Sequence, residues 1–239
     1  MGSISLLYKN SYPINDHISI TIPRVGEIID YGEDEYYGAV AGLTAMPIDM
    51  MVQLDDIGVD FTQINEYDLF VMLFSGMKSQ DMHLIFGDLD LSRFQLGVNQ
   101  QNGMFIFRDE ERDITIDRAI HGKIATVLRR IHRIEKDRHK PANEAAKDYM
   151  LERARAKLKR QRNKQKESQL ESHIVALVNT EQFKYDYESV RDLTIYQFNE
   201  SLMQIVQKVD YDNRMFGVYS GTINAKELRQ EDLNWLTHK

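Results

Sequence analysis

The spacing of the apolar residues changes along this chain, and each change indicates a different kind of secondary structure. The segment "HISITIP", residues 17–23, alternates in the manner of a short strand, whereas "INEYDLFVMLFSGM", residues 64–77, is typical of an apolar helix closed by glycine. The next runs, "MHLIF", "MFIFRD" and "DITIDR", are rich in aromatic or β-branched residues and are separated by polar turns that include Asn102-Gly103. Helical spacing returns between Ile120 and Ile134. These changes predict an α+β fold that is mostly helical, with a small antiparallel sheet in its N-terminal part.

The domain organisation follows from the helical segments beyond Pro141, which interrupts the preceding pattern. Residues 142–179 read as one long helix or as two helices end to end, and another apolar stripe of helical spacing lies further along the chain. We therefore predict three units. They are a mixed α+β domain of residues 1–140, a long basic connecting helix of residues 141–182, and a C-terminal helical unit of residues 183–239.

The charged residues are distributed unevenly. The chain carries 30 Lys and Arg against 37 Asp and Glu, which gives a net charge of −7. Residues 129–166 hold 15 of the basic and 5 of the acidic residues, so this span carries +10 and the remainder carries −17. On a helix, the spacing of four basic residues places them along one side: Arg153, Lys157, Arg160 and Lys164.

This basic helix has two interpretations. It could track the phosphates of a nucleic acid, or it could be a solvated helix whose charges meet acidic protein surfaces. No Phe, Tyr or Trp lies between residues 150 and 182, which excludes the base stacking that single-strand binders use there. We therefore favour the second interpretation and do not expect nucleic acid to be the main partner.

No residue pattern points to catalysis, a metal or a cofactor. The seven histidines show neither HExxH nor HxxxH spacing, and no glycine-rich phosphate loop is present. The absence of cysteine excludes thiolate chemistry, disulfides and Cys-type zinc sites. Asp88 and Asp90 could hold Mg²⁺ from one side of a strand, but turn residues after a strand explain the pair more simply. We expect no enzyme activity, no catalytic or metal site and no cofactor.

Hydropathy and cysteine content favour a cytoplasmic protein without a membrane partner. The longest uninterrupted apolar run is "LFVMLF", residues 69–74, which is far shorter than the ~20 residues of a membrane span. The N-terminus lacks the long apolar stretch and the cleavage site of a signal peptide. A chain without cysteine is suited to a reducing compartment.

Methionine is concentrated in one part of the chain. Seven of the eleven methionines lie between residues 46 and 104. Unbranched thioether side chains suit a groove that accepts varied apolar helices. The sequence therefore predicts a partner-binding site, and the alternative is simply a Met-rich core. The candidate residues are Met46, Met50, Met51, Met72 and Met77.

Three segments resemble a family of phage proteins that are encoded in the virion-structural gene blocks of phages and prophages of Gram-positive bacteria. They are "LTAMPIDMMVQLDDIGVDFTQINEYDLF" (43–70), "IFGDLDLSRF" (85–94) and "YQFNESLMQIVQKVDYDNRMFGVYSGT" (196–222). The resemblance covers nearly the whole chain. It implies a role in tail morphogenesis, and the size and gene setting of the family are similar to those of tail assembly chaperones.

Such a chaperone would be a helper in the host cytoplasm that covers the apolar helices of the tape-measure protein until the tail tube forms. The second reading is a structural subunit of the virion, at the baseplate, the neck or the completed tail end. A third reading is an accessory factor that binds nucleic acid through the basic helix. The implied partners are the tape-measure protein or neighbouring structural subunits, and a homo-oligomer is compatible with these readings.

Overall fold

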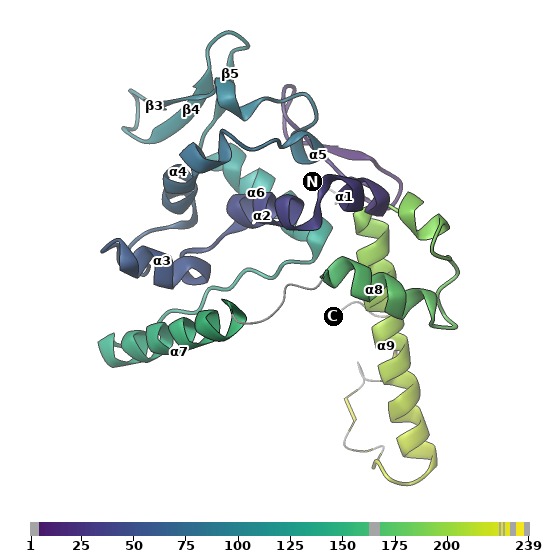
Figure 1. The fold of residues 1–239 in the computed structure, drawn as a ribbon. Coiled ribbons are helices and arrows are strands. Elements are labelled where there is room, and N and C mark those ends of the chain that lie inside the picture. Colours follow the sequence, from purple (N-terminus) through teal and green to yellow (C-terminus); the bar gives the residue numbers. More distant parts are fainter. Residues whose placement is uncertain (1–4, 163–167, 225, 227, 230–232, 237–239) are drawn as a thin grey trace.

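The computed structural model describes residues 5–162, 168–224, 226, 228, 229 and 233–236. It confirms an α+β fold that is mostly helical, with two small antiparallel sheets in the N-terminal part (Figure 1). The helices are α1 Val25–Tyr31, α2 Glu33–Thr44, α3 Met51–Asp56, α4 Glu66–Met77, α5 His83–Phe86, α6 Arg118–His132, α7 Glu144–Arg162, α8 Gln169–Val178 and α9 Ile195–Tyr219, with short 3-10 turns at Pro47–Met50, Leu91–Arg93 and Ser189–Asp192. The strands are β1 Ser11–Pro13, β2 Ser19–Thr21, β3 Gln95–Val98, β4 Phe105–Asp109 and β5 Ile114–Ile116.

Both sheets are antiparallel. β1 and β2 pair as a hairpin, and β2 lies inside the segment 17–23 that alternation predicts as a strand. β3, β4 and β5 form the second sheet in that order, and Phe107 of β4 lies opposite Leu96 on one side and Ile116 on the other. The predicted turn at Asn102-Gly103 lies in the loop between β3 and β4, where Gly103 adopts a φ of 69° that favours glycine.

The prediction of a strand at residues 82–86 is wrong, because these residues form the short helix α5. The Asp81 carboxylate accepts a hydrogen bond from the backbone N–H of His83 at 3.0 Å, and such a side-chain contact favours a helical turn directly after it. The turn places Ile85 and Phe86 in the core. An apolar run of five residues is compatible with a strand or with a short helix.

Aromatic side chains hold the three-stranded sheet on α4. Phe74 stacks on Phe107 with ring centroids 3.7 Å apart, and Phe70 meets Phe107 edge-on at 5.6 Å. The Tyr67 hydroxyl donates to the backbone carbonyl of Phe105 at 2.9 Å. Aromatic pairs of this kind add about 0.5–1.5 kcal/mol beyond the burial of their area. The sheet is therefore fixed to one side of α4, and other sides of the helix pack on α2 and α6.

Side-chain caps define where the main helices begin. The Asn65 side chain accepts from the backbone N–H of Tyr67 at the start of α4. Asp117 caps α6 and Thr194 caps α9 in the same way. Removing a cap of this kind costs about 1 kcal/mol, so these polar residues set the helix limits that apolar spacing alone leaves uncertain by several positions.

The beginning of α9 is tied to the N-terminal part of the chain by backbone hydrogen bonds. The N–H of Val25 donates to the carbonyl of Leu193 at 2.9 Å, and the N–H of Ile195 donates to the carbonyl of Pro23 at 2.8 Å. Apolar residues of α8 and α9 also join the large hydrophobic cluster that begins at Leu6; they are Leu170, Ile174, Leu177, Ile195 and Phe198. The division of the chain into three units stays a prediction.

Helix α9 is the longest described helix, and only its first half packs on the body. Its 25 residues give a length of about 37 Å. Near its start, Arg133 donates two hydrogen bonds to the Glu200 carboxylate at 2.9 and 2.8 Å. The second half extends away from the other helices (Figure 1), and the side chains of Phe216 and Tyr219 are exposed on it.

Candidate partner-binding groove

A groove of about 600 Å³ lies between α2 and α4, and we call it the α2–α4 groove. Five of the residues that line it are glycine or alanine: Gly38, Ala41, Gly42, Ala45 and Gly76. The larger side chains in the lining include Tyr37, Leu73 and two of the predicted methionines, Met50 and Met77. Small residues beside thioether groups make a surface that another backbone can approach closely and that can adapt to its shape.

Two glycines of the groove have open space where a side chain would begin. A Cβ atom added at Gly38 or Gly76 would meet no heavy atom within 4 Å. Gly42 differs, because an added Cβ would lie 3.2 Å from the sulfur of Met77. Gly42 therefore permits the close packing of α2 on α4, whereas Gly38 and Gly76 leave the groove open to solvent.

The five methionines predicted to bind a partner lie on different surfaces. Met50 and Met77 line the α2–α4 groove. Met46 lines a second cavity of about 510 Å³, and Met51 lines a third between α3 and α7. Met72 is exposed on α4. The structure thus brings only two of the five together in this groove, and a binding role for each of them stays a prediction.

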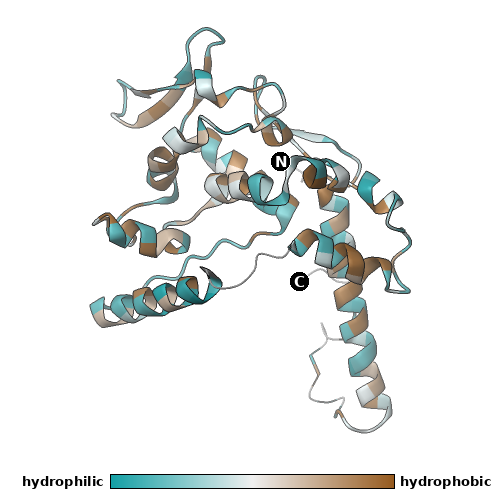
Figure 2. Cartoon of the chain, viewed as in Figure 1, coloured by the Kyte–Doolittle hydropathy of each residue, from teal (hydrophilic) through white to brown (hydrophobic). Residues whose placement is uncertain are grey.

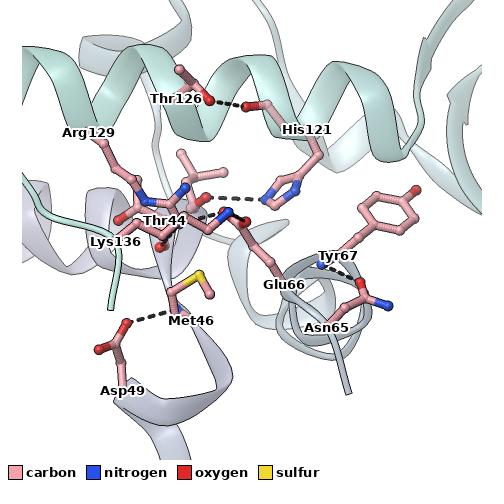
Figure 3. Close-up of polar contacts among 12 residues, drawn as sticks. Thr44, Met46, Asp49, Asn65, Glu66, Tyr67, His121, Thr126, Arg129 and Lys136 are labelled. Carbon is pink, nitrogen blue, oxygen red and sulfur yellow. Dashed lines mark hydrogen bonds and ion pairs between the residues drawn. The ribbon is translucent and has the colours of Figure 1, made fainter. Parts of the chain in front are cut away.

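Helix α6 holds the last turn of α2 through two side chains, which determines one wall of the groove (Figure 3). The Nε2–H of His121 donates to the carbonyl of Leu43 at 3.2 Å, and the guanidinium of Arg129 donates to the carbonyl of Thr44. The last carbonyls of a helix have no partner within the helix. These bonds satisfy two of them and fix the end of α2 against α6.

The charge of Arg129 is balanced by Glu66, the first residue of α4 (Figure 3). Arg129 Nη2 lies 2.5 Å from Glu66 Oε1, and Lys136 forms an ion pair with the other oxygen of the same carboxylate. The side chains of Arg129 and Glu66 are 9% and 15% exposed. A carboxylate in the first turn of a helix is also stabilised by the helix dipole. This buried pair connects α6 to α4, the other wall of the groove.

Burial and charge shift several pKa values around this network. Burial by itself would raise the pKa of Glu66, but the hydrogen bonds from Lys136 and Arg129 outweigh that effect and lower it. Burial lowers the pKa of His121 to about 4, with minor contributions from nearby Glu66, Arg129 and Lys136. Burial also lowers the pKa of His132 to about 4, and its Nε2 lies 3.0 Å from the hydroxyl oxygen of Tyr36. Both imidazoles are therefore neutral at pH 7.

Helix α7 packs on α3 through a small apolar contact and through ion pairs. Leu151 is buried in a cluster with Leu54 of α3. Two different guanidinium nitrogens of Arg155 each lie 2.6 Å from a separate carboxylate. The Nζ atom of Lys147 lies 2.7 Å from a third carboxylate. The acidic partners are Asp55, Asp56 and Asp60. Sequence reasoning missed these pairs, because their members lie between 87 and 100 positions apart.

The residues predicted to form the basic surface lie elsewhere on α7. Arg153, Lys157 and Arg160 are exposed, and in the described parts of the chain none of the three takes part in an ion pair. Lys164 lies outside the described residues. Among the described residues these three positive charges are not neutralised by an ion pair, and a role for them in binding an acidic surface stays a prediction.

Within the residues that the structure describes, no group of three or more His, Asp or Glu residues could hold a metal ion. Asp90 accepts a hydrogen bond from the backbone N–H of Ser92 at 2.9 Å and thereby caps the short turn that follows it. None of the described helices is both long enough and apolar enough to cross a bilayer.

We expect Arg129→Met to lower the free energy of unfolding by about 3–5 kcal/mol, because it removes one of the two cationic partners of the buried Glu66 carboxylate. Urea unfolding of Arg129→Met, Glu66→Gln and the double variant measures the coupling between the two side chains. The double variant should lose less stability than the sum of the single losses, by about 0.5–3 kcal/mol. Arg153→Met is the matched control on an exposed surface, with an expected change within about 0.5 kcal/mol. Strict additivity of the two losses would contradict the interpretation.

Stability is expected to fall as the pH decreases from about 6.5, where the unfolded histidines titrate, toward 4. The folded protein keeps His121 and His132 neutral until about pH 4, so the unfolded state binds more protons in this window. The free energy of unfolding then declines by about 1.4 kcal/mol per pH unit for each histidine. Urea unfolding at pH 7, 6 and 5 measures this slope. His132→Phe should roughly halve it, whereas substitution of the exposed His173 by Gln should leave it unchanged. An undiminished slope in His132→Phe would count against the assignment.

Comparison with known proteins identifies only the C-terminal part of the chain. No curated protein and no solved structure matches this chain. Residues 161–239, about a third of the chain, match the family described as YomV second domain. This is a phage-related family, and YomV is a prophage protein of Bacillus. The matched segment includes α8 and α9, so the part of the chain that carries the long projecting helix is similar to a phage-associated domain.

Proposed function

We propose that this chain is a non-enzymatic phage protein of tail morphogenesis that acts as an assembly chaperone for apolar helices of the tape-measure protein. The observation that supports this function best is the α2–α4 groove, which is open and lined by small residues and methionines. The similarity of residues 161–239 to a phage-associated domain supports the phage setting. The proposed activity is binding, without any chemical step.

The groove has the features that binding of an apolar helix requires. Gly38 and Gly76 expose backbone where an incoming helix would lie, so the two helices could approach closely. Met50 supplies a flexible apolar side chain next to these glycines, and the buried Met77 forms part of the apolar base of the groove. A bound helix would insert residues at positions i, i+4 and i+7 of its apolar face. The buried Arg129–Glu66 pair holds both walls of the groove before the partner arrives.

The rim of the groove is acidic. Asp49 and Glu135 are among its lining residues, and the chain outside residues 129–166 carries an excess of negative charge. A polar rim around an apolar centre is the usual arrangement of a protein–protein interface. Negative charge also keeps a complex with an apolar helix in solution.

Filling the groove should abolish this activity without unfolding the protein. In Gly38→Leu and Gly76→Leu the new side chain would occupy the open space of the groove, and both positions gain helix propensity, by about 1 kcal/mol relative to glycine. We expect affinity for a tape-measure helix to fall at least about tenfold, or about 1.4 kcal/mol. The measurement is the soluble yield of co-expressed tape-measure protein, followed by titration of one of its helical peptides.

Gly122→Leu is the matched control. Gly122 is also a helical glycine with open space around an added Cβ, but it lies on α6 and outside the α2–α4 groove. This variant should behave like the unmodified protein. If the two groove variants still increased the soluble yield as much as the control, the groove would not be the binding site.

Purified virions distinguish the chaperone from a structural subunit. A chaperone leaves before the particle is complete, so a peptide census of virions should find this chain far below the copy number of any tail protein. Its presence at stoichiometric copy number would reject the chaperone role and favour the second reading, a structural subunit of the baseplate, the neck or the completed tail end.

One feature favours this second candidate function. The projecting half of α9 exposes the apolar residues Val206, Val209, Phe216 and Tyr219, and it lies in the segment that is similar to a phage-associated domain. An extended helix with exposed apolar side chains is suited to packing against neighbouring subunits of an assembly. The virion census tests this reading directly.

A further inference from the structure

Strand β3 is an edge of the three-stranded sheet, and its sequence does not protect that edge. The sheet order is β3-β4-β5, so β3 pairs with β4 on one side only. Residues 95–98, "QLGV", contain neither a charged residue nor proline. Natural proteins generally blunt exposed edges with Lys, Pro or a bulge, because an open edge pairs readily with another strand.

The unpaired backbone groups of this edge can be assigned from the hydrogen-bond register. The N–H of Asn99 donates to the carbonyl of Met104 at 2.8 Å, which marks this as a hydrogen-bonded pair. In an antiparallel ladder such pairs alternate with non-hydrogen-bonded pairs. Gln95 and Gly97 therefore direct their backbone groups toward β4, and Leu96 and Val98 direct theirs outward. Among the described residues no hydrogen bond uses these outward groups.

The same two residues also expose apolar side chains. Leu96 lies opposite Phe107 and Val98 lies opposite Phe105, so all four side chains are on one face of the sheet. Phe107 is buried against α4, but Leu96 and Val98 are each 56% exposed and Phe105 is 50% exposed. The apolar face therefore continues beyond the body of the protein to the edge of the hairpin, where hydrophobic colouring reaches the rim of the molecule (Figure 2).

Gly97, between the two exposed residues, is not explained by the fold of a single chain. Its φ lies outside the range that favours glycine, and an added Cβ would meet only Ile106 at 3.8 Å, an ordinary contact. Glycine weakens a strand, and inside a strand it often marks the close approach of another backbone. Gly97 weakens the strand and lies at its open edge. Both facts fit a residue that allows the backbone of another chain to approach closely.

We propose that β3 pairs antiparallel with β3 of a second copy of this protein, around a twofold axis at Gly97, to form a continuous six-stranded sheet. In this register Leu96 of each copy forms a hydrogen-bonded pair with Val98 of the other, which uses every outward backbone group of the two residues. The two Gly97 residues face each other as a non-hydrogen-bonded pair, where backbones come closest. The twofold axis places the exposed Leu96, Val98 and Phe105 side chains of both copies on the same face.

A second copy fits this edge better than an unrelated strand for two reasons. The segment reads as an apolar residue, glycine and an apolar residue, so it is complementary to itself when reversed. It also carries no charge that would be brought opposite an identical charge. Isologous contacts of this type are the commonest way in which proteins form dimers. This inference does not depend on the proposed function, since the edge lies on the sheet and not in the α2–α4 groove.

Sedimentation equilibrium of the full-length chain tests the dimer. Between ~1 and ~100 µM, the unmodified protein should shift from monomer to dimer. Leu96→Lys and Val98→Lys should each raise the dissociation constant at least about 100-fold, since the introduced lysines of the two copies lie diagonally across the pair, roughly 7–8 Å apart. Both side chains are exposed, so at a protein concentration below the dissociation constant, where the unmodified chain is monomeric, the thermal midpoint should be unchanged. Ile57→Lys is the control, because Ile57 is 65% exposed but lies after α3. A chain that stays monomeric throughout, or a dimer that the two lysine variants do not weaken, would overturn the proposal.

Cysteine cross-linking tests the register, and the chain has no cysteine of its own. In the proposed dimer the Cα atoms of the two Gly97 residues lie about 4.5 Å apart, which is within disulfide range. The two Gln95 residues, on the same face of β3, would lie roughly 14 Å apart. Gly97→Cys should therefore form a disulfide-linked dimer under mild oxidation, whereas Gln95→Cys should remain monomeric on a non-reducing gel. Equal cross-linking of the two variants would indicate random collision and reject the register.

Discussion

The buried guanidinium of Arg129 is the contact on which the arrangement of the central helices depends. It reaches the backbone of α2 at Thr44 and the carboxylate of Glu66 at the start of α4, while its own helix is α6. A charge in such a position is tolerated only when it is paired and hydrogen-bonded. Displacement of α2 relative to α6 would break the hydrogen bond to Thr44, and displacement of α4 would separate the buried guanidinium from Glu66. Because α2 and α4 are the walls of the groove, the contacts of Arg129 also fix the positions of these walls.

Local patterns of the sequence predict the parts of this fold that depend on local interactions. The apolar stripe from Ile120 onward identifies α6, alternation identifies β2, and runs of aromatic and β-branched residues between polar turns identify β4 and β5. The strand predicted at residues 82–86 is wrong because a five-residue apolar run has no distinctive period, and the hydrogen bond from the N–H of His83 to Asp81 favours a helical turn there. Contacts between distant residues are not accessible in this way. Nothing near Arg155 in the sequence indicates that it pairs with Asp55 and Asp56.

The candidate groove was also predictable only in part, because it combines local sequence features with contacts between distant segments. The concentration of methionine in one part of the chain draws attention to the region in which the groove lies, and Met50 and Met77 line it. Proximity in sequence does not place residues on one surface, however, because successive helical positions are about 100° apart. Met72 and Met77 are separated by five positions on α4, so one is exposed while the other is buried. The glycines and alanines of the groove carry no functional signal in the sequence, since their role appears only when α2 and α4 pack side by side.

Helix α4 links the two surfaces that are proposed to contact other molecules. Phe70 and Phe74 hold the three-stranded sheet, while Leu73 and Gly76 line the groove about a third of a turn around the same helix. A sheet that continued through β3 into a second copy would therefore hold two grooves at a fixed separation. Under the proposed function, such a dimer would offer two grooves to the apolar helices of one tape-measure chain. The second binding event would then be intramolecular, so a modest affinity of each groove would be sufficient for a long-lived complex. Release would require only that one contact be lost at a time, as a chaperone that transfers its partner to a growing tube requires.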